Sequence, residues 1–212
     1  KDNGDVERKF FKDDFSVDTS SQYTGDVESF TWDTANQKLT TVTGGSLRLN
    51  KTFTSGDCYV KLQIDSYITA ANAVFVNLSS GSFPQIMLYS DGSGTTYTRY
   101  YLSASEHVTR NNQWTVGVPF NIGYSLDNKQ FIVKDRYYTV ADLEFVISDV
   151  MLGINVPASV AADVTVYDIV QMPSISYADN FTTDTVTGAN GRYQPVLGTV
   201  AYDNANKRMN VT

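Results

Sequence analysis

One run of residues, Tyr97-Thr98-Arg99-Tyr100-Tyr101, has side-chain types suited to holding a polar ligand. Side chains alternate between the two faces of a strand, so Tyr97, Arg99 and Tyr101 share one face while Tyr100 lies on the other, which is typical of core. Aromatic rings cover the apolar C–H surface of a sugar, and a few polar groups fix its orientation. Trp114 follows a polar run, and Tyr137 lies in a similar Arg-Tyr-Tyr group. The candidate ligand-binding residues are therefore Tyr97, Arg99, Tyr101, Trp114 and Tyr137.

Acidic residues near the two ends of the segment 12–173 offer a second kind of chemistry. Calcium takes six to eight oxygen ligands, many of them carboxylates. Aspartate at the end of a strand also terminates strands and forms turns, and this alternative stays open. The sequence indicates one candidate cofactor, a structural calcium ion, and the candidate ligands are Asp13, Asp14, Asp18 and Asp168.

Catalytic patterns are sparse in the sequence. A retaining glycosidase needs two carboxylates about 5–5.5 Å apart. The chain has four glutamates, none of them in a recognised catalytic motif. The nearest approaches to a carboxylate pair are Asp142-Leu143-Glu144, whose two acids could share a strand face, and Asp163 with Asp168. His107 is the sole histidine, and no Gly-x-Ser-x-Gly elbow accompanies it. We therefore expect that the chain is not an enzyme and that His107 is an ordinary polar loop residue.

Hydrophobic periodicity predicts strands through most of the chain. Period-two alternation in runs rich in Val, Ile, Tyr and Thr is typical of half-buried strands. The turn Asp91-Gly92-Ser93-Gly94 separates two of these runs and predicts a hairpin. Only residues 141–147 and 158–162 could form a short helical turn. The predicted strands are 46–50, 58–65, 72–78, 85–89, 96–102, 123–126, 130–133, 137–140, 150–156 and 163–171. The predicted fold is all-β, an antiparallel β-sandwich of the jelly-roll type.

Composition excludes some partners. The formal net charge is −7 and no basic stripe is visible, so we expect no nucleic-acid partner. No stretch approaches the ~20 apolar residues of a membrane span, so we expect no membrane insertion. Charged residues make up only 18% of the chain, and Ser, Thr and Asn fill the surface role. This composition favours an extracellular, cell-surface or virion location.

Two similar segments recur in the same order. Asp13-Asp14-Phe15-Ser16-Val17-Asp18-Thr19 returns as Asp179-Asn180-Phe181-Thr182-Thr183-Asp184-Thr185, and the segment beginning Trp32-Asp33 returns as Tyr202-Asp203. Residues 1–11 are predicted to be a linker or extension and residues 12–173 a β-sandwich module. Residues 174–212 are predicted to start a second, truncated copy, or to be a strand segment donated to a neighbouring subunit.

The opening Asp13-Asp14-Phe15-Ser16, the Trp32-Asp33 pair and the strand Val164–Val170 resemble concanavalin A-like lectin/glucanase jelly rolls over about residues 12–173. The resemblance implies that the first strand pairs with the last. It also implies contact with carbohydrate or a cell surface, as in phage tail and receptor-binding proteins, bacterial adhesins and accessory domains of glycanases. The glucanases of this family carry Glu-x-Asp-x-x-Glu, a motif that no glutamate of this chain matches.

Two functions from different classes follow. The first is a non-catalytic recognition module of a tandem-repeat surface or virion protein, with a glycan or cell-surface ligand as its partner. The alternative is a structural building block of a virion appendage, surface layer or filament, which self-associates through residues 177–212.

Overall fold

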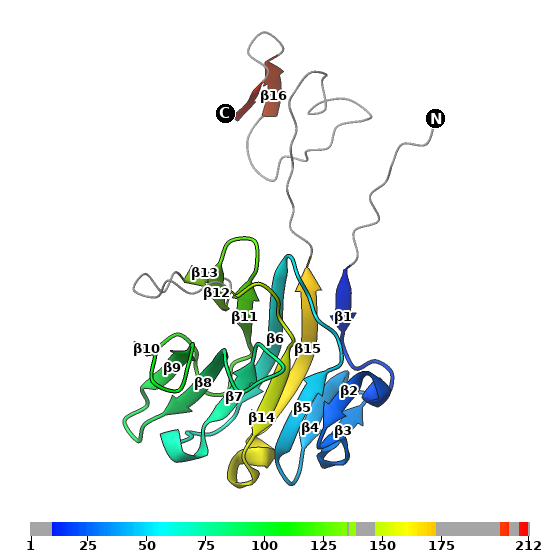
Figure 1. The fold of residues 1–212 in the computed structure, drawn as a ribbon, viewed down its shortest axis with the longest axis vertical. Helices are drawn as coiled ribbons and strands as arrows, with labels where there is room; N and C mark the ends of the chain where they lie inside the picture. The colour runs from blue at the N-terminus through cyan, green and yellow to red at the C-terminus, as the bar shows by residue number, and fades with distance from the viewer. Residues whose placement is uncertain (1–9, 135, 139–146, 173–199, 204–207, 212) are drawn as a thin grey trace. The chain divides into compact units, whose positions relative to one another are not determined.

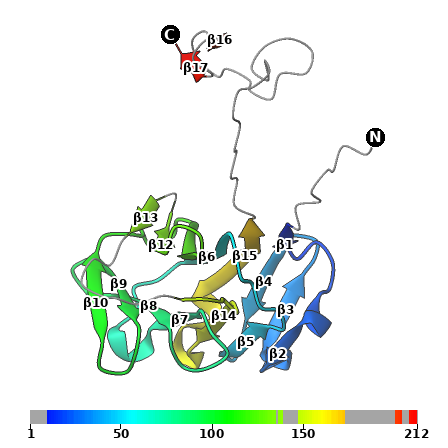
Figure 2. The same ribbon diagram turned by 45° about the horizontal axis from the view of Figure 1, so that its top comes forward.

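The computed structural model describes residues 10–134, 136–138, 147–172, 200–203 and 208–211. The chain divides into two compact units, Lys1–Ser174 and Ile175–Thr212. The first unit consists of two antiparallel sheets, drawn as two layers in Figures 1 and 2. The prediction of an all-β antiparallel sandwich is confirmed.

The first layer is an eight-stranded sheet in the order β13-β12-β11-β6-β15-β4-β3, with β1 also paired to β15. Its strands are β1 (Phe11–Asp13), β3 (Phe30–Asp33), β4 (Lys38–Thr41), β6 (Asp57–Ile64), β11 (Phe120–Ser125), β12 (Gln130–Val133), β13 (Arg136–Tyr138) and β15 (Val164–Met172). β1 is antiparallel to β15, with Phe11 opposite Gln171 and Asp13 opposite Ile169. The expected pairing of the first strand with the last is confirmed.

The second layer is a seven-stranded sheet in the order β10-β9-β8-β7-β14-β5-β2. Its strands are β2 (Tyr23–Gly25), β5 (Gly45–Leu49), β7 (Val74–Asn77), β8 (Gln85–Ser90), β9 (Thr96–Tyr101), β10 (His107–Asn111) and β14 (Gly153–Val156). The turn between β8 and β9 is the predicted hairpin. Its Gly94 has φ +90°, a conformation that L side chains rarely adopt.

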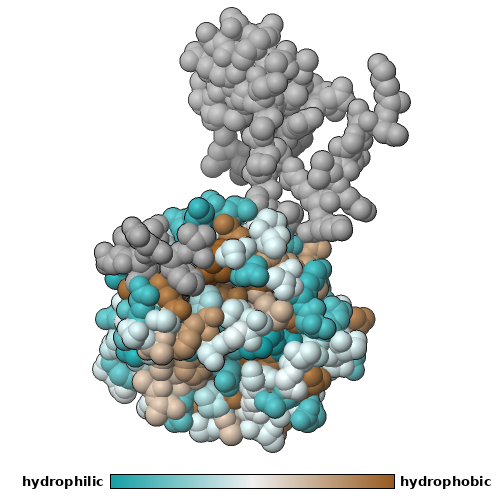
Figure 3. Space-filling view, viewed as in Figure 1, coloured by the Kyte–Doolittle hydropathy of each residue, from teal (hydrophilic) through white to brown (hydrophobic). Residues whose placement is uncertain are grey.

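Alternating burial explains why these segments form strands. In β6 every second side chain, from Cys58 to Ile64, is fully buried while the residues between are half-buried. Each buried aliphatic side chain contributes about 1.5–3 kcal/mol by leaving water. The inner faces of both sheets join in one hydrophobic cluster. The outer faces are polar and aromatic, and Figure 3 shows hydrophilic and hydrophobic residues interspersed on one side of the molecule.

Helical structure among the described residues is limited to four 3₁₀ turns: η1 (Ser20–Gln22), η2 (Val27–Ser29), η3 (Ala70–Asn72) and η4 (Ala158–Asp163). The last coincides with the helical turn expected at 158–162. Residues 139–146 lie outside the described residues. They include the end of the strand predicted at 137–140, most of the helical turn expected at 141–147, and the acids Asp142 and Glu144. None of the described helices has the length and apolar character needed to cross a membrane.

The described part of the second unit is a hairpin of β16 (Val200–Asp203) and β17 (Arg208–Val211). Asp203 lies opposite Arg208 in this hairpin. In the first unit, Asp33 lies opposite Lys38 in the hairpin of β3 and β4. The two hairpins therefore pair in the same register, 170 residues apart.

Candidate functional site

The outward face of β9 carries the three residues that the sequence places together. Tyr97, Arg99 and Tyr101 are half-buried, whereas the alternate residues Thr96, Thr98 and Tyr100 are buried. β9 lies between β8 and β10, so each of the three has neighbours on both sides. The predicted alternation is confirmed.

Arg99 is the centre of this surface. Its Nε donates to Oγ1 of Thr109 at 3.0 Å, Nη1 to the phenol oxygen of Tyr101 at 3.1 Å, and Nη2 to that of Tyr89 at 2.9 Å. The guanidinium also lies 5.3 Å from the ring centroid of Tyr89 and 5.9 Å from that of Tyr101. The hydrogen bond to Tyr101 is the main cause that raises the pKa of Arg99. A fixed cation is thus held between two aromatic rings.

Tyr89 and Tyr97 form a stacked pair beside Arg99. Their ring centroids are 4.9 Å apart and the planes differ by 9°. The phenol of Tyr97 donates to Oδ2 of Asp91 at 2.7 Å, while Oδ1 accepts hydrogen bonds from Ser93 and from the backbone N–H of Thr95. Hydrogen bonds from Ser93 and then Tyr97 lower the pKa of Asp91 to about 2. The β8–β9 turn therefore fixes the orientation of the stacked rings.

The surface extends past Tyr101 to the edge strand. The ring centroid of His107 lies 5.1 Å from that of Tyr101, and the ring centroid of Phe83 lies 6.1 Å from that of Tyr101. His107 starts β10 directly opposite Tyr101, so the expectation of an ordinary loop residue was wrong. Sequence reasoning also missed Tyr89, although its position in the predicted strand 85–89 was a usable signal. We call the group Tyr89, Tyr97, Arg99, Tyr101 and His107 the Arg99 surface.

Trp114 is placed differently from the expectation. Its side chain is 2% exposed, and the ring is stacked with Phe120 at a centroid distance of 5.5 Å. Its Nε1 donates to the backbone carbonyl of Tyr97 at 3.2 Å. Trp114 lies in the loop after β10, but its ring is buried, so it is not an exposed candidate for ligand binding and instead supports β9 from the inner side. It also forms part of the wall of a shallow hollow with Tyr67 and Asn112.

Tyr137 lies on β13, in the opposite sheet from Arg99. It is 48% exposed, and its phenol donates to Oδ2 of Asp57 at 2.6 Å. This hydrogen bond is the main cause that raises the pKa of Tyr137 to about 12. The structure therefore does not bring Tyr137 together with the β9 residues.

The four candidate calcium ligands contact groups of the protein itself, and Asp14 and Asp168 share the ammonium of Lys12. Asp13 is buried and accepts hydrogen bonds from Thr19, from the phenol of Tyr23 and from the backbone N–H of Phe15. Asp14 and Asp18 each accept a hydrogen bond from the backbone N–H two residues later, which is turn geometry.

Asp168 forms an ion pair with Lys12, whose Nζ is 3.2 Å from Oδ1. Within the described ranges, no three His, Cys, Asp or Glu side chains form a group that could hold a metal. The four aspartates are therefore not gathered into one group, and calcium binding stays a prediction.

The chain matches no family model and no curated protein. Solved structures do resemble it. A Bacillus licheniformis β-glucanase superposes with a TM-score of 0.54 at 8% identity, over 78% of this chain and 98% of that one. The carbohydrate recognition domain of Emp46p, in a metal-free form, gives 0.53 at 14%, over 77% and 95%. The Crh5 transglycosylase gives 0.54 at 11%, over 78% and 84%.

These likenesses concern the fold. The expectation that the chain is not an enzyme is corrected by them, because glucanases and a transglycosylase share its architecture and the fold is compatible with enzymatic activity. The chain has the concanavalin A-like jelly-roll fold that occurs both in glucanases and in carbohydrate recognition domains.

Proposed function

We propose that the first unit is a carbohydrate-binding module and that the Arg99 surface holds the glycan. The observation that carries this proposal is the arrangement of Arg99, which is hydrogen-bonded to Tyr89 and Tyr101 on the outside of a sheet. Aromatic rings beside a fixed cation suit a ligand with both an apolar C–H face and many hydroxyls.

Preorganisation favours binding at this surface. Three nitrogens of Arg99 already donate to protein oxygens, and Asp91 holds the outer phenol of the stacked pair. Ordering a long side chain on binding costs about 0.5–1.5 kcal/mol, and here the protein has already met that cost. Arg99 has five N–H donors, so some remain for a sugar hydroxyl.

The similar structures support a glycan as the ligand class. One is a carbohydrate recognition domain, one is a β-1,3-1,4-glucanase, and Crh5 is also known in complex with NAG. Their names describe those proteins. For this chain they support a first set of probes made of β-glucan and N-acetylglucosamine oligosaccharides.

The proposed setting is a tandem-repeat protein of a cell surface, virion or other extracellular structure. The shared register of the β3–β4 and β16–β17 hairpins supports a second copy of the module beginning in the second unit. Repeated weak sites gain avidity when several bind one polymer.

A second candidate function is self-assembly through residues 177–212. In the first unit β4 pairs on its other side with β15, with Leu39 opposite Val166. The hairpin of β16 and β17 is a two-stranded sheet among the described residues. Since such a hairpin is marginally stable alone, a strand from another subunit is a suitable partner.

A glycan array tests the first function. The full chain should bind a defined subset of glycans, the Tyr97→Ala variant should lose that binding, and Tyr137→Ala should retain it. Chain-length analysis of the recovered glycan distinguishes binding from turnover. Binding that is equal in all three proteins would reject the Arg99 surface.

Light scattering tests the second function. If the second unit drives assembly, residues 1–212 should form larger species than residues 1–174 at the same concentration. Two monomers of the expected masses would reject assembly through this segment.

A further inference from the structure

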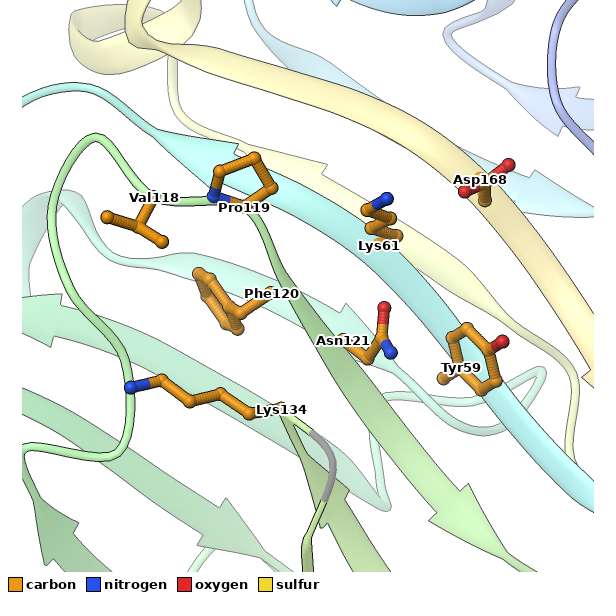
Figure 4. Close-up of a pocket in the computed structure, with 8 residues that line it drawn as sticks. All are labelled: Tyr59, Lys61, Val118, Pro119, Phe120, Asn121, Lys134 and Asp168. Carbon is orange, nitrogen blue, oxygen red and sulfur yellow. The ribbon is translucent and has the colours of Figure 1, made fainter. Parts of the chain in front are cut away.

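A hollow of about 440 Å³ lies on the outer face of the eight-stranded sheet, the opposite sheet from Arg99. Figure 4 shows the side chains that line it, contributed by β6, β11, β15, the segment before β11 and the turn after β12. The polar ones are Lys61, Asn121, Lys134 and Asp168, and Tyr59 and the apolar run 118–120 complete the wall.

The polar side chains form a row that the strand register fixes. Asn121 lies opposite Lys61, and Lys61 lies opposite Asp168. The backbone N–H of Lys134 donates to the carbonyl of Asn121 at 2.8 Å, so Lys134 continues the row on the other side. Neighbouring strands are about 4.8 Å apart, which places the two lysine backbones about 10 Å apart with Asn121 between them. In Figure 4 the side chain of Lys134 extends away from Asn121, and Nζ of Lys61 lies 6.0 Å from the ring centroid of Tyr167. Both side chains are long, so a change of rotamer brings the two ammonium groups to one ligand lying over Asn121.

The charges of the row are unbalanced. Asp168 is already engaged by Lys12 at 3.2 Å. Neither Lys61 nor Lys134 forms an ion pair with a carboxylate of the described residues, and the side-chain amide of Asn121 has no hydrogen bond to any of them. In a chain of net charge −7, this hollow thus places two lysines beside the single carboxylate of Asp168 and an amide that has no side-chain hydrogen bond within the described part of the chain. Such a group of donors attracts an anion.

The hollow also has an apolar wall. Val118 is 48% exposed and, with Pro119, forms one side, while the ring of Tyr59 lies on the other. The volume is in the range of small-molecule sites, which is about 300–1,000 Å³. A bare inorganic anion would contact the lysines and leave this wall unused. A sugar that carries a carboxylate would use both.

We propose that this hollow is a second binding site, specific for an anionic sugar such as a uronic acid. The carboxylate lies between Lys61 and Lys134 over the amide of Asn121, and the sugar ring rests against Val118, Pro119 and Tyr59. The site is independent of the Arg99 surface, because it lies on the other sheet.

The test is an NMR titration of the ¹⁵N-labelled full chain with glucuronate, glucose and inorganic phosphate in parallel. Glucuronate and glucose differ at the carboxylate, and phosphate supplies charge without a ring. Glucuronate should shift the side-chain amide of Asn121 and the backbone of β6 and β11. Glucose should not, and phosphate should bind more weakly. Equal responses to glucuronate and glucose, or to glucuronate and phosphate, would overturn the assignment.

Charge-matched variants complete the test. Lys61→Gln and Lys134→Gln should each weaken glucuronate binding by about tenfold, since each removes a charge-assisted contact. Lys129→Gln removes the same charge from an exposed turn and should leave binding within about twofold. Tyr97→Ala should leave glucuronate binding at this hollow unchanged, because Tyr97 belongs to the Arg99 surface on the other sheet. A loss in Lys129→Gln as large as that in Lys61→Gln would reject the site.

Discussion

Arg99 binds Tyr89 in two ways: Nη2 donates a 2.9 Å hydrogen bond to the phenol oxygen, and the guanidinium lies 5.3 Å from the ring centroid. Tyr89 in turn stacks on Tyr97, so the position of the Tyr97 ring also depends on Arg99. A cation and two rings are thus held in one geometry on the outside of the seven-stranded sheet. The proposed glycan site depends on this relationship.

Replacing Arg99 by lysine tests the cation's geometry. Lysine keeps the charge but presents a point donor in place of the planar fork, so the bonds to Thr109, Tyr89 and Tyr101 cannot all be kept. We expect glycan affinity to fall about tenfold or more, as measured by calorimetry. Arg110→Lys, on the exposed edge strand β10, is the matched control. Unchanged affinity in Arg99→Lys would mean that only charge matters.

Replacing Tyr97 by alanine removes the outer ring of the stacked pair. An aromatic contact is worth about 0.5–1.5 kcal/mol beyond its buried area, so affinity should fall about tenfold. Since Tyr97 is only half-buried, the unfolding midpoint should change little. Tyr137→Ala removes an exposed tyrosine from the other sheet and should bind like the parent chain. A parallel loss in both variants would contradict the account.

The Asp91 carboxylate should titrate near pH 2, because Ser93 and Tyr97 donate hydrogen bonds to its ionised form. A lowered folded-state pKa means that this group stabilises the fold above its ordinary value near 4, and that the contribution disappears as the pH falls through about 2. Carbon-13 NMR of the carboxyl group measures the pKa directly. Tyr97→Phe should move it upward, and an unchanged value would show that the phenol contributes nothing.

Asp13 should be required for stability. Its buried carboxylate accepts hydrogen bonds from the Tyr23 phenol and from the Phe15 backbone, and alanine would leave these donors unpaired. We expect Asp13→Ala to lower the free energy of unfolding by about 2–4 kcal/mol in a denaturant titration. The neighbouring Asp14 is more exposed, and Asp14→Ala should cost less than about 1 kcal/mol. Similar losses in both variants would contradict a specific role of Asp13.

Cys58 should be unreactive in the folded chain. The side chain is fully buried on β6, and burial is the main cause that raises its pKa to about 12. Thiolate is the reactive form, so a thiol reagent at pH 8 should label the native protein only on the timescale of unfolding. In denaturant, one thiol per chain should react at once. Rapid labelling of the native protein would show that β6 is accessible.

Local patterns were sufficient for β9 and for the hairpin that precedes it. Alternation alone placed Tyr97, Arg99 and Tyr101 on one face, because the side-chain period of a strand depends only on the backbone. The roles of Tyr89 and His107 depend on how β8 and β10 pair with β9, and register between strands is not contained in the pattern of one strand.

Burial was harder to predict where polar residues surround the buried one. Trp114 follows a polar run, yet its ring is buried and packs against Phe120 at the start of β11. In the sequence Asp13 is one of several acids near a strand end, and its burial is explained by its partners Thr19 and Tyr23. Such contacts depend on the tertiary arrangement, which local composition does not specify.

The most direct test of the central claim is to map where a glycan binds. The ¹⁵N-labelled full chain would be titrated with the strongest binder from the array while the backbone signals and the Arg99 Nε–H signal are followed. The account predicts shifts confined to β8, β9, β10 and the Arg99 Nε–H. Shifts elsewhere on the first unit with none at Arg99, or no glycan that binds at all, would contradict it.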